Sequence, residues 1–513
     1  MAERPKTQKI LSLIFLSGIH LLGVSLYSQS LIIPEPALQQ AIANSLGVAE
    51  RDLTEDLIAE KLIRLEANDL EIRDLSGLDR AKNLQYLVLR NNLIEDLSPV
   101  KKLSKLRKLD LQGNRLVDLS TFTPLSGFAR KNQIAESQQN LSDPLTKESQ
   151  RTEKLIDTTP SGELLSDARL ALLELNLSNN RLLGLSGIEH FTQLRHLDVS
   201  NNSLIDLEGI SKLSNLVNFY AHGNQLGRIE EYVDRNRNKQ YDLGEPFTDE
   251  SGNGKRDIDP LIELKGLTNL VDLHLYGNRL KDINSFGELS ALQTLLLSGN
   301  ELEEVGILKK FYTLKQLSLA NNQLYTIEGI QSLDNLERLN LSENHICDLR
   351  PLRSLFSLHT LDLHSNIIVE LNDLSRLSAL RSLGLSYNLI HNPLPILSLP
   401  VLSNLSLSKN RIPIENREIS VALELAKSRG VYLNIRNQFP RSMEAENLTR
   451  LLMGYPEANL ELSNYLRSNG YRSLCNFLQD KKFNEDTISE TLRLWKNSLK
   501  KKIRLGNLPF PEN

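Results

Sequence analysis

The sequence repeats itself with a fixed period, and this period restricts the possible folds more than any other feature. The segment from Leu84 to Leu97 reads L-x-x-L-x-L-x-x-N-x-I-x-D-L. Nine of the eleven steps between the asparagines of successive copies are 22 residues long. The step from Asn114 to Asn180 is 66 residues, and the step from Asn224 to Asn278 is 54 residues. These asparagines are Asn92, Asn114, Asn180, Asn202, Asn224, Asn278, Asn300, Asn322, Asn344, Asn366, Asn388 and Asn410. The chain is therefore a repeat array with two insertions.

Each repeat predicts one short strand, because alternate leucines of the L-x-L stretch point to the same side of an extended backbone. Successive strands are expected to pair in parallel, and no single coil buries its core without its neighbours. The recurrent asparagine carries both a donor and an acceptor, so we expect it to satisfy buried backbone groups where each coil bends. An earlier copy has Leu70 at the asparagine position. The pattern predicts an α/β solenoid of about 13 coils, with a parallel β-sheet on its concave face.

The residues before the first repeat predict a helical N-terminal cap. Apolar residues with helical spacing are Leu38, Ala41, Ile42 and Leu46. Together with the 22-residue frame, this cap resembles bacterial leucine-rich repeat proteins of the internalin type, over about residues 34–437. The resemblance implies a right-handed solenoid that binds a protein partner.

The expected domain organisation has four parts. Residues 1–30 form a signal peptide, residues 31–61 the N-terminal cap, and residues 62–437 the leucine-rich repeat solenoid, with insertions at about 126–168 and 228–258. Residues 438–513 form a C-terminal α-helical region, where Thr487 and Glu490 have capping-box spacing.

The N-terminus indicates export from the cytoplasm. Arg4, Lys6 and Lys9 precede an apolar run over residues 10–26, and small residues follow it. This order is typical of a secretory signal, and an uncleaved N-terminal anchor is the alternative. We expect a periplasmic, cell-surface or secreted protein with no integral membrane domain beyond this segment.

Charge and composition limit the kind of partner. The chain has 60 Lys and Arg against 64 Asp and Glu, a net charge of -4. No long-range positive field attracts a polyphosphate, which argues against a nucleic-acid partner. Basic residues gather near the C-terminus, namely Lys496, Lys500, Lys501, Lys502 and Arg504. They indicate a solvated face with a favourable helix C-terminus, or a contact with an anionic membrane or an anionic partner.

The second insertion contains the clearest chemical pattern. Oxygen-bearing residues at positions 1, 3, 5, 7, 9 and 12 of a calcium loop are Asp234, Asn236, Asn238, Gln240, Asp242 and Glu245. A second, less complete copy offers Asp249, Ser251, Asn253 and Asp257. The alternative is a polar loop without a metal, since Lys239 stands where glycine usually makes the turn.

The middle coils carry an unusual set of polar and aromatic residues on the expected concave face. These candidate partner-binding residues are His196, Asp198, Tyr220, His222, Asp272, His274 and Tyr276, with Asp362 and His364 further along. Same-face residues of neighbouring strands lie close enough to act together, and tyrosine is enriched at binding interfaces. An ordinary polar surface and a His/Asp metal site are the alternatives, although metal-binding spacing such as H-E-x-x-H is absent.

The sequence therefore predicts a non-catalytic, exported protein that binds another macromolecule, expected to be a protein, through its concave face. Neither a G-x-S-x-G nor a G-x-x-x-x-G-K-[ST] motif is present, which argues against an enzyme. The main alternative is a periplasmic structural or assembly scaffold that acts through the C-terminal helices. Carbohydrate binding is a third possibility, for which the sequence offers few aromatic platforms.

Overall fold

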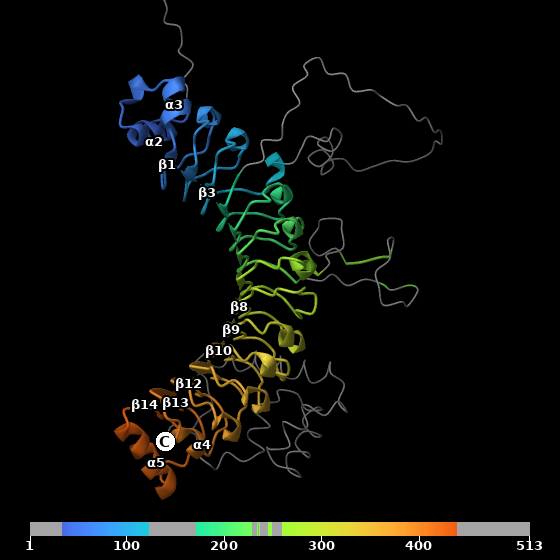
Figure 1. Ribbon diagram of the computed structural model, residues 1–513, viewed down its shortest axis with the longest axis vertical. Helices are drawn as coiled ribbons and strands as arrows, with labels where there is room; N and C mark the ends of the chain where they lie inside the picture. The colour runs from blue at the N-terminus through green and yellow to red at the C-terminus, as the bar shows by residue number, and fades with distance from the viewer. Residues whose placement is uncertain are drawn as a thin grey trace, which may run out of the picture.

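The computed structural model describes residues 33–122, 171–227, 233, 235, 245–248 and 259–438. These residues form one open sheet of 14 parallel strands in chain order. The strands are β1 (Arg64–Glu66), β2 (Tyr86–Val88), β3 (Lys108–Asp110), β4 (Glu174–Asn176), β5 (His196–Asp198), β6 (Asn218–Tyr220), β7 (Asp272–His274), β8 (Thr294–Leu296), β9 (Gln316–Ser318), β10 (Arg338–Asn340), β11 (Thr360–Asp362), β12 (Ser382–Gly384), β13 (Asn404–Ser406) and β14 (Tyr432–Asn434). The predicted solenoid is confirmed, and the coils follow an arc whose inner side is the sheet (Figure 1).

Short helices form the convex side of the arc, opposite the sheet (Figure 1). They are the 3-10 helices η2 (Leu78–Arg80), η3 (Val100–Lys102), η4 (Ser120–Phe122), η5 (Ile188–His190), η6 (Ile210–Lys212), η7 (Pro260–Leu264), η8 (Gly306–Lys310), η9 (Ile330–Ser332), η10 (Arg350–Leu352) and η11 (Asn372–Leu374), and the α-helix α4 (Leu394–Leu397). A helical segment takes up more width than a strand, so the sheet becomes the concave face.

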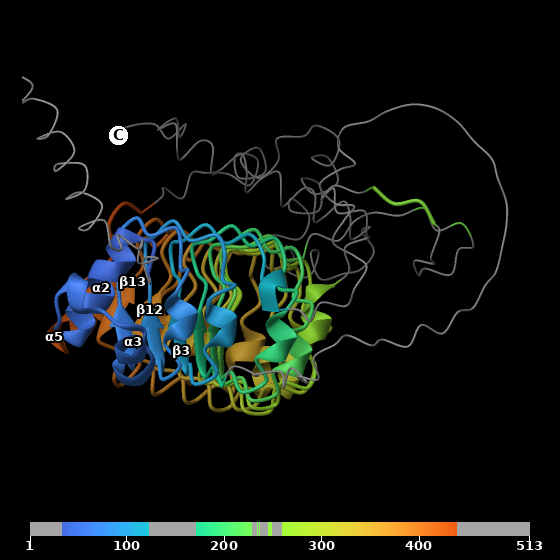
Figure 2. The same cartoon turned by 90° about the horizontal axis from the view of Figure 1, so that it is seen from above.

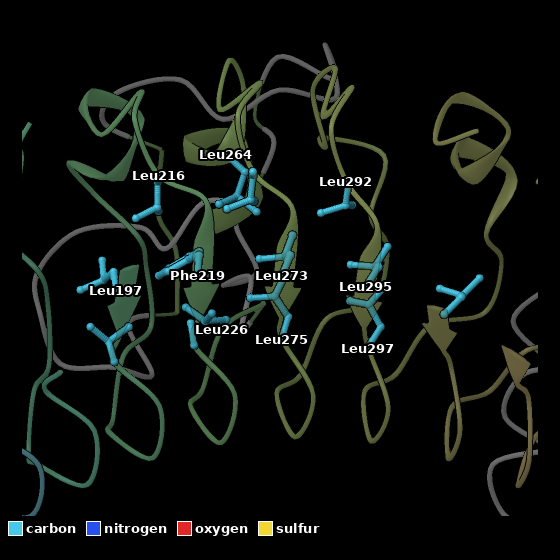
Figure 3. Packing of buried hydrophobic residues seen from close by; sticks show 14 of the residues in the cluster. Leu197, Leu216, Phe219, Leu226, Leu264, Leu273, Leu275, Leu292, Leu295 and Leu297 are labelled. Carbon is cyan, nitrogen blue, oxygen red and sulfur yellow. The ribbon is translucent and has the colours of Figure 1, made fainter. Parts of the chain in front are cut away.

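One continuous apolar core runs through the stack of coils. The central strand residues Leu197, Phe219, Leu273 and Leu295 are buried on neighbouring strands and point into the interior (Figure 3). Their register is fixed by parallel pairing, which sets Leu197 opposite Phe219 and Leu273 opposite Leu295. Each coil therefore completes the core of the next, as expected for a repeat array.

The recurrent asparagines connect neighbouring coils, as the sequence predicts. Asn322 is fully buried. Its side-chain nitrogen donates to the carbonyl oxygens of Leu297 and Leu319, both at 3.0 Å, and its oxygen accepts from the amide of Leu302 at 3.1 Å. Leu297 and Leu302 belong to the preceding coil, so one side chain satisfies backbone groups of two coils.

The same kind of contact closes the end of the stack. Gln438 donates from its side-chain nitrogen to the carbonyl oxygens of Leu407 and Ile435 at 2.9 Å. Its side-chain oxygen accepts from the amide of Ile412 at 3.2 Å. A glutamine therefore takes the place of the asparagine after the last complete repeat.

The two insertions leave the sheet uninterrupted. Lys108 of β3 pairs with Glu174 of β4 across the first insertion, and Asn218 of β6 pairs with Asp272 of β7 across the second. The strands on either side of each insertion are therefore direct neighbours.

Both ends of the core are covered. At the N-terminus lie α2 (Pro36–Leu46), η1 (Glu50–Asp52) and α3 (Glu55–Lys61), which Figure 2 shows at the near end of the stack. At the C-terminus lie α5 (Arg417–Ser428), whose first turn is capped by Asn416, and the final strand β14. The strand count exceeds the expected number of coils because β14, which follows α5, pairs with β13 and extends the sheet.

Several sequence-based predictions lie outside the described residues: the signal peptide, the first insertion and the C-terminal helices with their basic residues. Within the residues that the structure describes, no helix has both the length and the apolar character needed to cross a bilayer. Cys347 is buried, and Cys475, the other cysteine of the chain, lies outside the described part.

Replacing a core asparagine should destabilise the solenoid. We expect Asn322→Ala to lower the free energy of unfolding by roughly 2–4 kcal/mol, because buried backbone groups of two coils lose their partner. Urea denaturation followed by circular dichroism measures the effect. The matched control is Asn284→Ala at an exposed position, which should change stability by less than about 0.5 kcal/mol. Equal midpoints for the two variants would contradict the structural role of the asparagine.

Candidate functional site

The candidate site occupies the middle of the concave face, on β5 to β7 and the residues just after them. The first and third residues of each strand point away from the core, as does the second residue beyond the strand. Parallel pairing sets Tyr220 beside His274 and Asn218 beside Asp272. The amide of Gly223 donates to the carbonyl oxygen of Tyr276, which continues the ladder beyond the strands.

Four rings form two parallel stacks in this region, which we call the ring cluster: Tyr220, His222, His274 and Tyr276. The ring centroids of Tyr220 and His274 lie 4.3 Å apart with an interplanar angle of 20°. Those of His222 and Tyr276 lie 4.1 Å apart at 15°. The two histidine rings are 6.5 Å apart, which connects the stacks. Stacked rings hold one another in place, so the cluster is a rigid surface feature.

Burial keeps the histidines of the cluster neutral. It lowers the pKa of His222 and of His274 below the usual 6.5, although nearby carboxylates act in the opposite direction. Burial also raises the pKa of the Tyr220 and Tyr276 hydroxyl groups. At neutral pH the ring cluster therefore carries no charge of its own.

Two carboxylates border the ring cluster. Asp198 on β5 accepts hydrogen bonds from the amide of Ser200 at 2.9 Å and from its hydroxyl at 2.6 Å. Asp272 on β7 accepts a hydrogen bond from the side-chain nitrogen of Asn218. Asp198 affects the pKa of all four rings, which places its charge within electrostatic reach of the whole cluster.

Most of the predicted site residues come together. The structure confirms that the four rings stack on neighbouring strands and that Asp198 and Asp272 lie beside them. His196 is on the same face but exposed, and it takes no part in the ring contacts. Asp362 and His364 form a separate pair on β11 and its extension, in which the ring nitrogen Nδ1 of His364 lies 2.9 Å from Asp362 and this hydrogen bond raises the pKa of His364.

Sequence reasoning missed two residues of the site, Asn218 and Ser200. Asn218 lies 54 residues before Asp272, and this spacing equals the step from Asn224 to Asn278 across the second insertion. Adding the length of each step to a strand position therefore finds its neighbour on the next strand. Ser200 follows the same rule one period before His222.

The calcium-loop residues are almost all outside the described part of the chain. Of the proposed ligands only Glu245 is described, and it is 8% exposed. One oxygen of its carboxylate accepts a hydrogen bond from the amide of Arg235 at 2.8 Å. In the described residues, no group of three or more histidine, cysteine, aspartate or glutamate side chains is arranged to hold a metal ion. The two calcium-like loops lie almost entirely outside these residues and stay a prediction.

Comparison with known proteins agrees with the fold. The family described as "Leucine Rich repeats (2 copies)" matches residues 82–126 and 312–354, and "Leucine Rich Repeat" matches residues 193–216. No curated protein matches the sequence significantly. These segments of the chain match leucine-rich repeats, and the 14-stranded parallel sheet is that of a leucine-rich repeat solenoid.

Two solved structures have a similar solenoid. An internalin (InlF) from Listeria monocytogenes has 19% sequence identity and a TM-score of 0.54, with 80% of this chain and 92% of that chain covered. A leucine-rich repeat protein from Leptospira interrogans has 22% identity and a TM-score of 0.52, with 77% and 91% covered. The expected resemblance to internalins is thereby confirmed for the fold.

The histidines should titrate in a defined order. We expect His222 and His274 to have midpoints below 6.5 because burial disfavours their charged forms, and His364 to have a midpoint above 6.5 because Asp362 stabilises its charged form. Nuclear magnetic resonance of the ring protons as a function of pH measures all three, with histidine substitutions for assignment. A midpoint for His222 or His274 above that of His364 would contradict the described cluster.

Proposed function

We propose that this protein is exported and binds a protein partner, without catalysis, through the concave face centred on the ring cluster. The observation that carries the proposal is the pair of ring stacks on adjacent strands, Tyr220 with His274 and His222 with Tyr276. Rigid aromatic side chains lose little conformational entropy when they bind, and they dominate the energetics of many interfaces.

The surroundings of the ring cluster support this role. The arc of the sheet gives the middle strands a concave setting for a partner (Figure 1). Neighbouring coils contribute smaller polar groups, such as Thr294 and Ser298, which suit the rim of an interface. Tyr276 is 37% exposed, so part of its ring is available for contact.

Binding rather than catalysis fits the position of the cluster on an open sheet. Acid-base catalysis gains most where water is excluded from the reacting groups. The ring cluster lies on an accessible face, and its histidines contact tyrosine rings rather than forming a hydrogen-bonded pair with an acid.

The alternative proposal is a structural or assembly scaffold in the periplasm that acts through the C-terminal helices. Those helices lie outside the described residues, so the proposal rests on the sequence. A variant lacking residues 440–513 separates the two functions, because concave-face binding should survive this deletion and scaffold binding should not.

A binding test needs a defined probe and matched variants. A random-peptide library displayed on phage is selected on the immobilised full chain, and the affinities of selected peptides are then measured by calorimetry. We expect alanine substitution of all four rings to weaken peptide binding at least tenfold, with little change in melting temperature because the rings lie outside the leucine core.

The control is Tyr432→Ala, on the same face of the sheet at its C-terminal end. It should change peptide affinity by less than about twofold, as expected for a residue outside the contact. If every selected peptide binds the four-alanine variant as well as it binds the wild type, the ring cluster is not the site.

We also propose that the second insertion binds calcium. The support is the oxygen spacing of Asp234 to Glu245 together with the burial of Glu245, the residue at the closing position. Calorimetry of the full chain with calcium chloride should give a binding heat in the millimolar range that Asp234→Ala abolishes. Glu288→Gln, an exposed substitution outside the loop, should leave the heat unchanged. No heat for the wild type at millimolar calcium would refute calcium binding.

A further inference from the structure

The charges of the concave face are balanced at its N-terminal end. Asp110 forms an ion pair with Arg90 at 2.7 Å, and Glu174 forms one with Lys108 at 2.6 Å. Glu66 is likewise paired, with Arg64. Each of these acidic groups has a basic partner within the protein itself.

The carboxylates beside the ring cluster differ from these. Asp198 and Asp272 receive hydrogen bonds from the neutral groups of Ser200 and Asn218, and neither makes an ion pair with any described residue. The histidines between them are neutral at neutral pH because burial lowers the pKa of each. The centre of the face therefore holds two negative charges that no basic group of the described chain neutralises.

Small side chains flank one of the two ring stacks. One period before His222 the sequence has Ser200, and one period after Tyr276 it has Ser298. Backbone hydrogen bonds from Asn201 to His222 and from Gly277 to Ser298 place these residues on adjacent coils. The outer sides of the His222 and Tyr276 stack thus face small serine side chains rather than further rings.

This arrangement discriminates between ligand charges. A cation is attracted to the face of a tyrosine ring and to both carboxylates, and the attraction increases when a partner excludes water. An acidic group meets two like charges. An apolar group would cover the carboxylates without neutralising them, which carries a desolvation cost.

We propose that the ring cluster receives a lysine or arginine side chain of the protein partner, bound against the tyrosine faces and neutralised by Asp198 and Asp272. This inference rests on the proposed function and names the chemistry of the residue that the site recognises. The partner segment is therefore basic at the centre of the contact.

A pH dependence follows from the same groups. The charged or titratable side chains at the cluster are Asp198 from β5, Tyr220 and His222 from β6 and its extension, and Asp272, His274 and Tyr276 from β7 and its extension. Acidification below 6.5 adds positive charge at His222 and His274, so affinity for a basic segment should fall as the pH falls.

The experiment compares charge variants against the library-selected peptides. Asp198→Asn with Asp272→Asn removes both charges and keeps an acceptor oxygen for Ser200 and for Asn218. The matched control is Asp362→Asn, on the same face next to His364. Melting temperatures of both variants check that each is folded.

We expect peptides that require the ring cluster to be enriched in lysine or arginine at one position. Their affinity should fall about tenfold or more in the double asparagine variant, since the loss of a close charge pair commonly has effects of this size. It should stay within about twofold in Asp362→Asn, whose charge is remote from the cluster, and it should weaken with added salt.

Two results would overturn the inference in different ways. Cluster-dependent peptides without a basic residue, or with equal affinity for the double variant, contradict cation recognition and leave the concave-face site intact. Absence of any cluster-dependent peptide contradicts the site itself, and cation recognition is rejected with it.

Discussion

The buried asparagine side chain is the contact on which the rest of this structure depends. In every coil that has this asparagine, its side chain bonds backbone groups of its own coil and of the preceding one, as Asn322 does with Leu319, Leu297 and Leu302. Three directional bonds from one side chain fix both the bend of the coil and its offset from its neighbour. The leucines alone do not fix this offset, because apolar burial has no preferred direction. A constant offset keeps equivalent positions of successive coils side by side. Surface residues at these positions can therefore act together as one site.

The period predicts the fold because spacing and chemistry agree in every coil. It predicts the end of the array less well, since Gln438 takes the role of the asparagine there. The last coil therefore does not match the asparagine pattern. The ring cluster is predictable for the same reason as the fold: its residues hold fixed positions in the frame. Charge pairing is harder to predict, because Lys108 and Glu174 are 66 residues apart and the choice of partner depends on rotamers and local geometry.

The negative charge of the site depends on which side chains the neighbouring coils place beside its carboxylates. Carboxylates at equivalent strand positions are neutralised near β1 to β4, where the adjacent coil supplies Arg90 or Lys108. Beside Asp198 and Asp272 the adjacent coils supply rings and amides instead. Carboxylates without a basic partner cost little folding free energy here because solvent screens charges on an exposed face. The same charges become costly when a partner covers them, so the energetic demand for a cation arises only on binding.

The second insertion lies in the sequence between the two coils that build the ring cluster, and it leaves the pairing of their strands intact. Residues 228–258 separate the two coils in the sequence, yet Tyr220 and His274 are direct partners in the sheet. Long loops cost little extra entropy once their ends are fixed, so the sheet need not change to accommodate one. A rearrangement of the rings would have to overcome the direct pairing of β6 with β7, which holds the two stacks in place.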